Sequence, residues 1–328
     1  KGVINMNNFK KIGLSALAGS LVAVSAHAAE FSVSGSASIT MDRPVLDKGV
    51  ATGNDFSMGD SLGFNASGET DGGLGVAVYY EIDNGALDDY DMTLSGDWGS
   101  LKFNGSGSSS ALGAIDDVTP NAYEEAWDIV DYDGTLTVGA PTVIGGGGGT
   151  NMFIYTSPSF SGATITAAYQ NDGGAAAVAG SYHDFAIAVS PEAVEGLTLG
   201  YGAGSVPVAG NELEKDNSTM YVKYAIGGFT VGYQQSESDH DTTSSSQDSM
   251  AYGITYAVND DFSIGYSYHE VEFDSGASNN TDQQSTGISA SYTMGGMTLG
   301  GAMNEVESMD GVATGDYEGY EFNLSFAF

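Results

Sequence analysis

Seven acidic residues lie in one long stretch of the chain, Ser108 to Thr150, which contains no basic residue. They are Asp116, Asp117, Glu124, Glu125, Asp128, Asp131 and Asp133. Carboxylates gathered without counter-charges attract cations, and in a narrow aqueous passage they bias which ions enter. Carboxylate oxygens also suit calcium, although the spacing fits no EF-hand loop and singles out no ligand. We therefore expect a cation-attracting segment, with calcium as a candidate bound ion.

The same stretch is longer than a compact domain tolerates in a connection without a function. Thr119 and Pro120, followed by Ala122 to Trp127, predict a short helix that Thr119 caps and Pro120 begins. The run Gly145 to Gly149 predicts a flexible return of the chain, because no Lys-Ser or Lys-Thr follows it as a phosphate loop requires. These features favour a functional loop over a nucleotide site.

Residue patterns for enzymatic chemistry are weak. The sequence has no cysteine, so thiolate chemistry and disulfides are excluded. His183, His240 and His269 are far apart, and no G-x-S-x-G pattern singles out a serine nucleophile. We predict that the protein is not an enzyme.

In the segments that would position the acidic stretch, apolar and polar residues alternate with a period of two. From Phe31 to Met41, serine or threonine occupies every second position, and the intervening residues are apolar or glycine. From Tyr320 to Phe328, aromatic residues and leucine alternate with polar or small residues. This period is that of a β-strand with a different environment on each face. Such strands can separate water from lipid.

About sixteen such strands follow one another, joined alternately by short turns and longer polar loops. Gly227-Gly228 and Asn259-Asp260 are examples of the turns, and Ser236 to Gln247 and Asp274 to Gln283 are examples of the loops. An even number of strands with short connections on one side is typical of transmembrane β-barrels. We predict an all-β fold, a closed antiparallel barrel of about sixteen strands, with the stretch Ser108 to Thr150 folded inward as its third loop.

An export signal is predicted at the amino terminus. Lys10 and Lys11 form a positive segment, Ile12 to Ser25 is an apolar core too short to span a bilayer comfortably, and a small-x-small cleavage pattern follows. Residues 1–28 would then be removed, and residues 29–328 would form the barrel. This division predicts export to the cell outer membrane.

The charge balance is strongly acidic. The chain has 43 acidic and 8 basic residues, with a formal net charge of -35, and all the acidic residues follow the predicted signal. Such a protein repels nucleic acid and attracts cations. Nucleic acid is therefore not an expected partner.

Strand parity predicts which charged residues face the interior of the barrel. The expected inward-facing residues are Lys102, Lys223, Glu81, Asp89, Asp91 and Glu321. With the acidic loop, they predict a lumen of net negative charge that prefers cations.

The signal, the strand pattern and the last strand together resemble bacterial outer-membrane barrels, and the long third loop resembles that of sixteen-stranded general porins of Rhodobacter-like bacteria. The resemblance implies a water-filled channel for small hydrophilic solutes and ions, and a homotrimer in outer-membrane lipid. It also implies that Phe328 is part of the signal read by the barrel-assembly machinery. General porins usually set an arginine cluster on the wall against loop 3. This chain has a single arginine, Arg43, which we expect in an external loop.

Two alternatives remain at this point. One is a substrate-specific outer-membrane channel, for sugars or phosphate. The other is a secreted acidic β-rich adhesin or surface-layer protein, in which the apolar faces of a β-sandwich would pack against each other in one core. A membrane channel and a secreted β-sandwich differ in what the apolar face of each strand contacts, which is lipid in the channel and the protein core in the sandwich.

Overall fold

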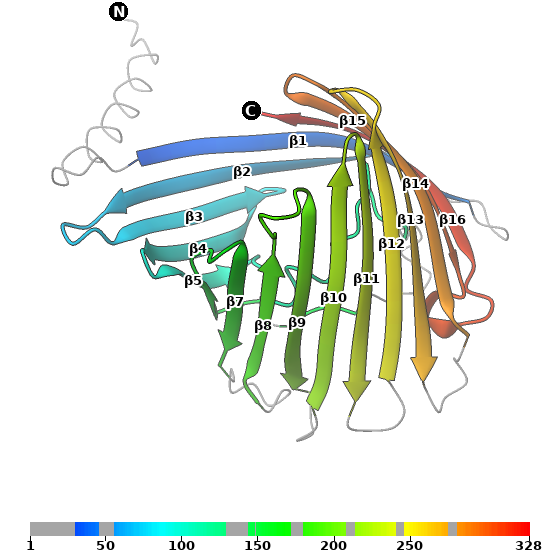
Figure 1. Cartoon of the computed structure of the whole chain (residues 1–328). Helices are drawn as coiled ribbons and strands as arrows, with labels where there is room; N and C mark the ends of the chain where they lie inside the picture. The colour runs from blue at the N-terminus through cyan, green and yellow to red at the C-terminus, as the bar shows by residue number, and fades with distance from the viewer. Residues whose placement is uncertain are drawn as a thin grey trace, which may run out of the picture.

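The computed structural model describes residues 30–45, 56–128, 144–147, 149–171, 180–207, 214–240, 246–274 and 281–328. These residues form sixteen antiparallel strands in one closed barrel, in which every strand pairs with its neighbours in sequence and β1 pairs with β16 (Figure 1). The predicted fold class is confirmed. The predicted signal, residues 1–28, lies outside the described residues.

The strands differ in length, and those beside the long loop are among the shortest. Their bounds are β1 Glu30–Val45, β2 Phe56–Glu69, β3 Gly75–Asp83, β4 Ala86–Gly96, β5 Gly99–Ser106, β6 Met152–Thr156, β7 Ala163–Gln170, β8 Tyr182–Val189, β9 Leu197–Pro207, β10 Glu214–Ile226, β11 Phe229–His240, β12 Ser246–Ala257, β13 Phe262–Asp274, β14 Gln283–Met294, β15 Met297–Glu307 and β16 Tyr317–Ala327. A 3-10 turn, η1 Met309–Gly311, precedes β16. The described residues contain no helix long and apolar enough to cross a bilayer.

The two faces of each strand meet different surroundings, as the alternation predicts. On β13, Ile264 and Tyr266 are exposed on the outer face, whereas Ser267 and His269 are buried on the inner face. The large apolar side chains therefore point away from the barrel instead of into a shared core. This arrangement is that of a membrane barrel, and the described strands do not form the two packed sheets that the β-sandwich alternative requires.

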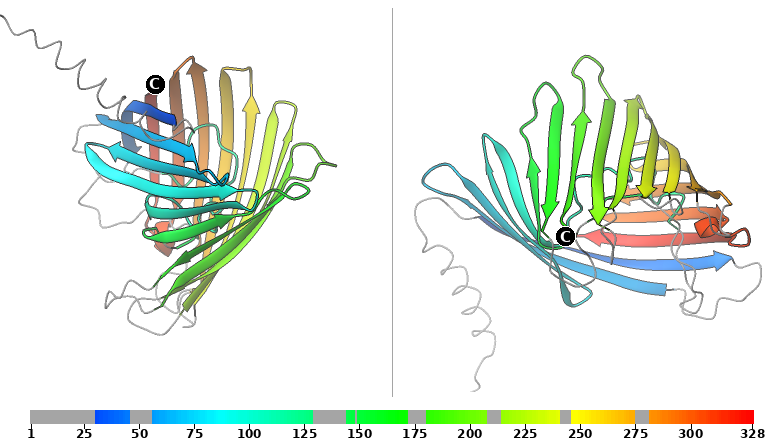
Figure 2. Two further views of the ribbon diagram at one scale, coloured as in Figure 1. Left: turned by 90° about the vertical axis from the view of Figure 1, so that its left-hand side faces the viewer. Right: turned by 90° about the horizontal axis from the view of Figure 1, so that it is seen from below.

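The first and last strands join to close the barrel. Their register runs from Ser36 opposite Ala327 to Val45 opposite Glu318, and both views of Figure 2 show β1 beside β16. Beyond the last paired residue of β16, the Phe328 amide donates to the Gly35 carbonyl at 2.9 Å, and the Gly35 amide donates to the Phe328 carbonyl at 2.8 Å. The sheet therefore has no open edge at this seam.

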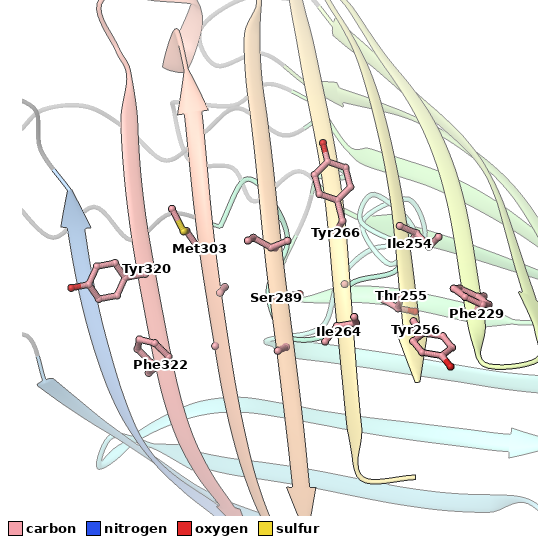
Figure 3. Close-up of a pocket in the computed structure, with 15 residues that line it drawn as sticks. Phe229, Ile254, Thr255, Tyr256, Ile264, Tyr266, Ser289, Met303, Tyr320 and Phe322 are labelled. Atoms are coloured by element: carbon pink, nitrogen blue, oxygen red, sulfur yellow. The ribbon is translucent and has the colours of Figure 1, made fainter. Parts of the chain in front are cut away.

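The outer wall carries an apolar hollow of about 910 Å³ over β11 to β16. Ile264, Tyr266, Met303 and Phe322 are among its lining side chains (Figure 3). Gly301 and Ala290 are small residues among its larger lining side chains. A surface of this composition suits contact with hydrocarbon.

Two expectations about strand ends were wrong. Arg43 was expected in an external loop, but it lies within β1, opposite Tyr320 of β16. The loop expected from Ser236 to Gln247 is shorter, because β11 continues to His240. These polar segments still pair as β-strand because strands can extend beyond the apolar band into water. There, alternation in hydrophobicity no longer marks a strand in the sequence.

Candidate functional site

The long connection between β5 and β6 lies against the inner face of the barrel. Its described residues, 107–128, 144–147 and 149–151, contact side chains from β5, β8, β10, β11, β14, β15 and β16. We call this connection the inner loop. Asp131 and Asp133, which were predicted to belong to its acidic set, lie outside the described residues.

Asn104 and Asp184 hold the two legs of the inner loop, and both side chains are buried. The Asn104 amide Nδ2 donates to the carbonyls of Ser108 at 3.3 Å and Gly149 at 2.6 Å, so one side chain ties the outgoing and returning legs together. The Asp184 carboxylate accepts from the backbone amide of Leu112 at 2.7 Å. It also accepts from the Ala111 amide at 3.2 Å. Buried acceptors that bond backbone amides fix a segment strongly.

Tyr182, on the same strand as Asp184, links the two legs a second time. Its hydroxyl donates to Asp184 at 2.6 Å and accepts from the Gly147 amide at 2.9 Å. On β10, the Asn217 amide donates to the Gly145 carbonyl at 2.6 Å. The returning glycine segment is thus held to the wall where the structure describes it.

Three side chains, from β11, β14 and β15, hold the middle of the inner loop to the barrel wall. Gln234 of β11 accepts from the Val118 amide at 3.0 Å and donates to the Asp116 carbonyl at 2.7 Å. The Ser289 hydroxyl of β14 accepts from the Ala122 amide at 3.1 Å. Asn304 of β15 donates to the carbonyls of Glu125 at 2.7 Å and Asp128 at 2.9 Å. Finally, the Tyr123 hydroxyl donates to Glu321 of β16.

These contacts explain why the predicted short helix from Ala122 to Trp127 was wrong. The segment consists of bends and turns. Its Ala122 amide bonds the Ser289 hydroxyl and its Glu125 carbonyl bonds the Asn304 side chain, while the backbone bond from the Asp128 amide to the Glu125 carbonyl, at 3.2 Å, closes one turn only. The Thr119 hydroxyl, predicted to cap the helix, is buried and has no hydrogen-bond partner among the described residues. The wall side chains therefore replace the helical bonds, an outcome that local sequence cannot show.

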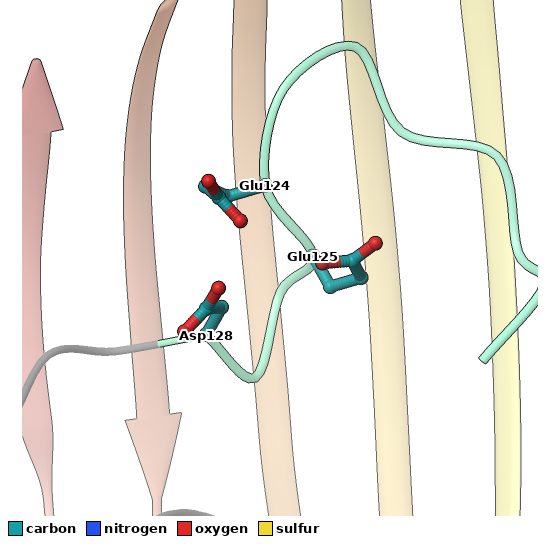
Figure 4. Close-up of side chains that lie close together, drawn as sticks. All are labelled: Glu124, Glu125 and Asp128. Atoms are coloured by element: carbon teal, nitrogen blue, oxygen red, sulfur yellow. The ribbon is translucent and has the colours of Figure 1, made fainter. Parts of the chain in front are cut away.

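The acidic residues of the inner loop fall into two groups. Asp116 and Asp117 lie near β11, and Glu124, Glu125 and Asp128 lie near β15, where each offers a carboxylate oxygen within 4.8 Å of the others (Figure 4). Three hard oxygen ligands at this separation could hold a divalent cation such as calcium, with water completing its coordination. The sequence predicted calcium but not these ligands.

Burial of the loop carboxyls changes how readily they ionise. It raises the pKa of Asp116 to about 6, and burial with the nearby charges of Glu125 and Asp116 raises that of Asp117 to about 7. Burial and a hydrogen bond with Asp128 raise the pKa of Glu124. The negative charge of the inner loop therefore depends on pH near neutrality.

The wall formed by β3 to β5 carries four of the other charged residues that were predicted to face inward. Lys102 forms an ion pair with Asp91 at 3.2 Å, and both line a hollow of about 440 Å³ with Asp89. Glu81 accepts a hydrogen bond from the Tyr79 hydroxyl at 2.7 Å. Four of the predicted wall residues thus gather on neighbouring strands.

Lys223 lies apart from them, on β10, with Tyr221 and Thr219 on the same face. Lys215 shares this parity and is half-buried on the same strand. Lys215 was not among the lysines expected to face inward, because β10 begins earlier than its apolar pattern indicates.

A closed barrel with an apolar outer wall and a charged loop seated inside defines a β-barrel channel of the outer-membrane type. The sequence profile described as Gram-negative porin matches residues 13–299. The chain belongs to the Gram-negative porin family. No curated protein matches the chain significantly.

Solved porin structures share this fold at low sequence identity. A porin refined at 1.8 Å resolution is 18% identical with a TM-score of 0.63, covering 91% of this chain and 100% of that one. OmpF of Salmonella typhi, solved with daunomycin, is 12% identical with a TM-score of 0.65, covering 91% and 97%. A mutant of the Rh. blastica porin is 16% identical with a TM-score of 0.60, covering 91% and 100%.

Proposed function

We propose that this porin lets small hydrophilic solutes and ions diffuse passively through the outer membrane, with a preference for cations. The observation that carries the preference is the charge on the two sides of the passage. Carboxylates of the inner loop stand on one side, and Glu81, Asp89 and Asp91 stand on the β3 to β5 wall. Fixed charges of one sign along a narrow aqueous path favour ions of the other sign.

Few positive charges oppose them. Within the described residues, Lys102, Lys215 and Lys223 share the inner-face parity. Lys102 is paired with Asp91, so that pair contributes little net charge to the passage. The balance of the described inner surface is therefore negative, which supports cation preference over the phosphate-specific alternative.

The proposal also covers assembly, export and oligomeric state. Phe328 is 73% exposed beside the β1–β16 seam, where the assembly machinery could reach it. We include in the proposal its role as an assembly signal and a homotrimer in outer-membrane lipid, both of which the resemblance implies. We also include export through a cleaved signal, which the pattern of residues 1–28 predicts.

Ion selectivity in planar bilayers tests the preference. In a KCl gradient, we expect a reversal potential of the sign that potassium permeation gives. The double variant Asp89→Asn and Asp91→Asn should lower the cation-to-anion permeability ratio by about twofold, because it removes wall charge and leaves Lys102 unpaired.

Asp260→Asn is the matched control, since it removes an exposed carboxylate from the short turn between β12 and β13. We expect it to leave the permeability ratio unchanged. Anion preference in the unmodified protein would refute the proposal.

A further inference from the structure

Six strands place a glycine on the inner face beneath the inner loop. They are Gly202 on β9, Gly232 on β11, Gly253 on β12, Gly265 on β13, Gly287 on β14 and Gly300 on β15. A Cβ atom added at any of them would meet the inner loop, at Leu112 and Ile115, Pro120, Pro120, Ala122, Ala126 and Tyr123 respectively. We call these six residues the glycine seat.

At Gly253 and Gly265, the atoms nearest to an added Cβ belong to the loop backbone rather than to a mobile side chain. At Gly253, an added Cβ would collide with the carbonyl of Pro120. At Gly265 it would lie 2.8 Å from the Ala122 nitrogen, and ordinary contact begins at 3.4 Å. Backbone cannot yield by changing rotamer, so the loop itself would have to move.

The glycines are also neighbours across the sheet. Gly232 pairs with Gly253, and both Gly253 and Gly287 pair with Ser267. Figure 4 shows the inner loop passing over this part of the sheet. Glycine weakens a strand interior, and its presence there marks a close approach of another backbone.

We propose that the glycine seat sets the width of the channel, an inference that rests on the proposed function. Because these six positions carry no side chain, the inner loop lies close against the wall formed by β9 and β11 to β15, and the passage runs between it and the β3 to β5 wall. A side chain at the seat pushes the loop toward that facing wall. The bonds from Gln234, Ser289 and Asn304 keep the loop attached, so the displacement narrows the passage.

The test is Gly253→Val in the full chain, compared with Gly59→Val. Gly59 shares the inner-face parity of β2, and among the described residues the only atom within 4 Å of its added Cβ is the Ser38 hydroxyl, at 3.1 Å. Single-channel conductance and the size limit for neutral sugars in liposome swelling are measured on both. We expect Gly253→Val to lower conductance by about twofold and to reduce the size limit, while Gly59→Val resembles the unmodified protein.

A rescue experiment separates positioning from general damage to the sheet. Gly232→Ala places its methyl group against the Pro120 ring, and Pro120→Gly removes that ring. The double variant should recover most of the conductance that Gly232→Ala loses. A folding defect in the strand would not respond to a change in the loop.

The outcomes distinguish the two proposals. If the unmodified protein forms no channel, the proposed function fails and the inference falls with it. If the unmodified protein conducts, and Gly253→Val and Gly232→Ala conduct equally or more, the seat does not set the width and the proposed function stands. Should Gly253→Val not fold, Gly232→Ala and its rescue by Pro120→Gly decide alone. If the double variant does not recover conductance, the inference is overturned.

Discussion

Asp116 and Asp117 show how position in the barrel changes the chemistry of a single residue. Both occur in an acidic stretch that is evident in the sequence. The protein around them raises their pKa values to about 6 and about 7. An acid with a raised pKa is neutral below that value and charged above it, so these two residues gain negative charge across the neutral range.

Cation preference should therefore increase as pH rises from 5 to 8. The reason is that up to two negative charges, on Asp116 and Asp117, are added beside the passage as their protons leave. Reversal potentials at a fixed KCl gradient over this pH range would measure the change.

The double variant Asp116→Asn and Asp117→Asn provides the control, because it cannot gain these charges. Its permeability ratio should vary less with pH than that of the unmodified protein. A preference for cations that strengthens on acidification would contradict this assignment.

At the scale of elements, the inner loop owes its conformation to strands far from it in sequence. The strands themselves were predictable, because two environments on opposite faces impose a period of two. The acidic character and inward position of the loop were expected as well. Its anchors were not, since Asp184, Gln234 and Asn304 are single polar residues that nothing in the neighbouring sequence distinguishes from other polar residues of the strands. Their hydrogen bonds to the loop backbone are evident only in the three-dimensional structure.

Asp184→Ala should release the first leg of the inner loop. It removes the acceptor of the Ala111 and Leu112 amides and of the Tyr182 hydroxyl, and each unsatisfied buried donor costs about 1–3 kcal/mol. A Glu-specific protease applied to the folded protein should then cleave after Glu124 or Glu125 faster than in the unmodified protein.

Asp216→Ala is the matched control, since Asp216 is an exposed residue of β10. We expect its cleavage rate to equal that of the unmodified protein. Equal rates for Asp184→Ala would mean that the other anchors hold the loop without Asp184.

At the scale of the whole molecule, the barrel separates two solvents with one layer of chain. Ile264 and Ser263 are adjacent on β13, yet Ile264 is 44% exposed on the apolar outer wall and Ser263 has inner-face parity. Neighbouring residues therefore experience opposite demands. The period of two in the sequence records this difference directly.

Ile264→Lys should destabilise the barrel far more than Ser263→Lys. A lysine on the lipid face near the bilayer midplane costs about 2–4 kcal/mol, whereas one facing water costs little. Urea unfolding in lipid vesicles, followed by the difference in gel migration between folded and boiled protein, would measure both. Equal destabilisation by the two variants would argue against a lipid-facing outer wall.

The pairing of β1 with β16 also constrains how the protein is made. β1 begins at Glu30 and β16 ends at Ala327, so the two strands cannot pair until synthesis of the chain has reached β16. Any intermediate that lacks the last strand has two rows of unbonded amides and carbonyls, which hydrocarbon does not tolerate. Insertion of the barrel must therefore wait until β16 is available to pair with β1.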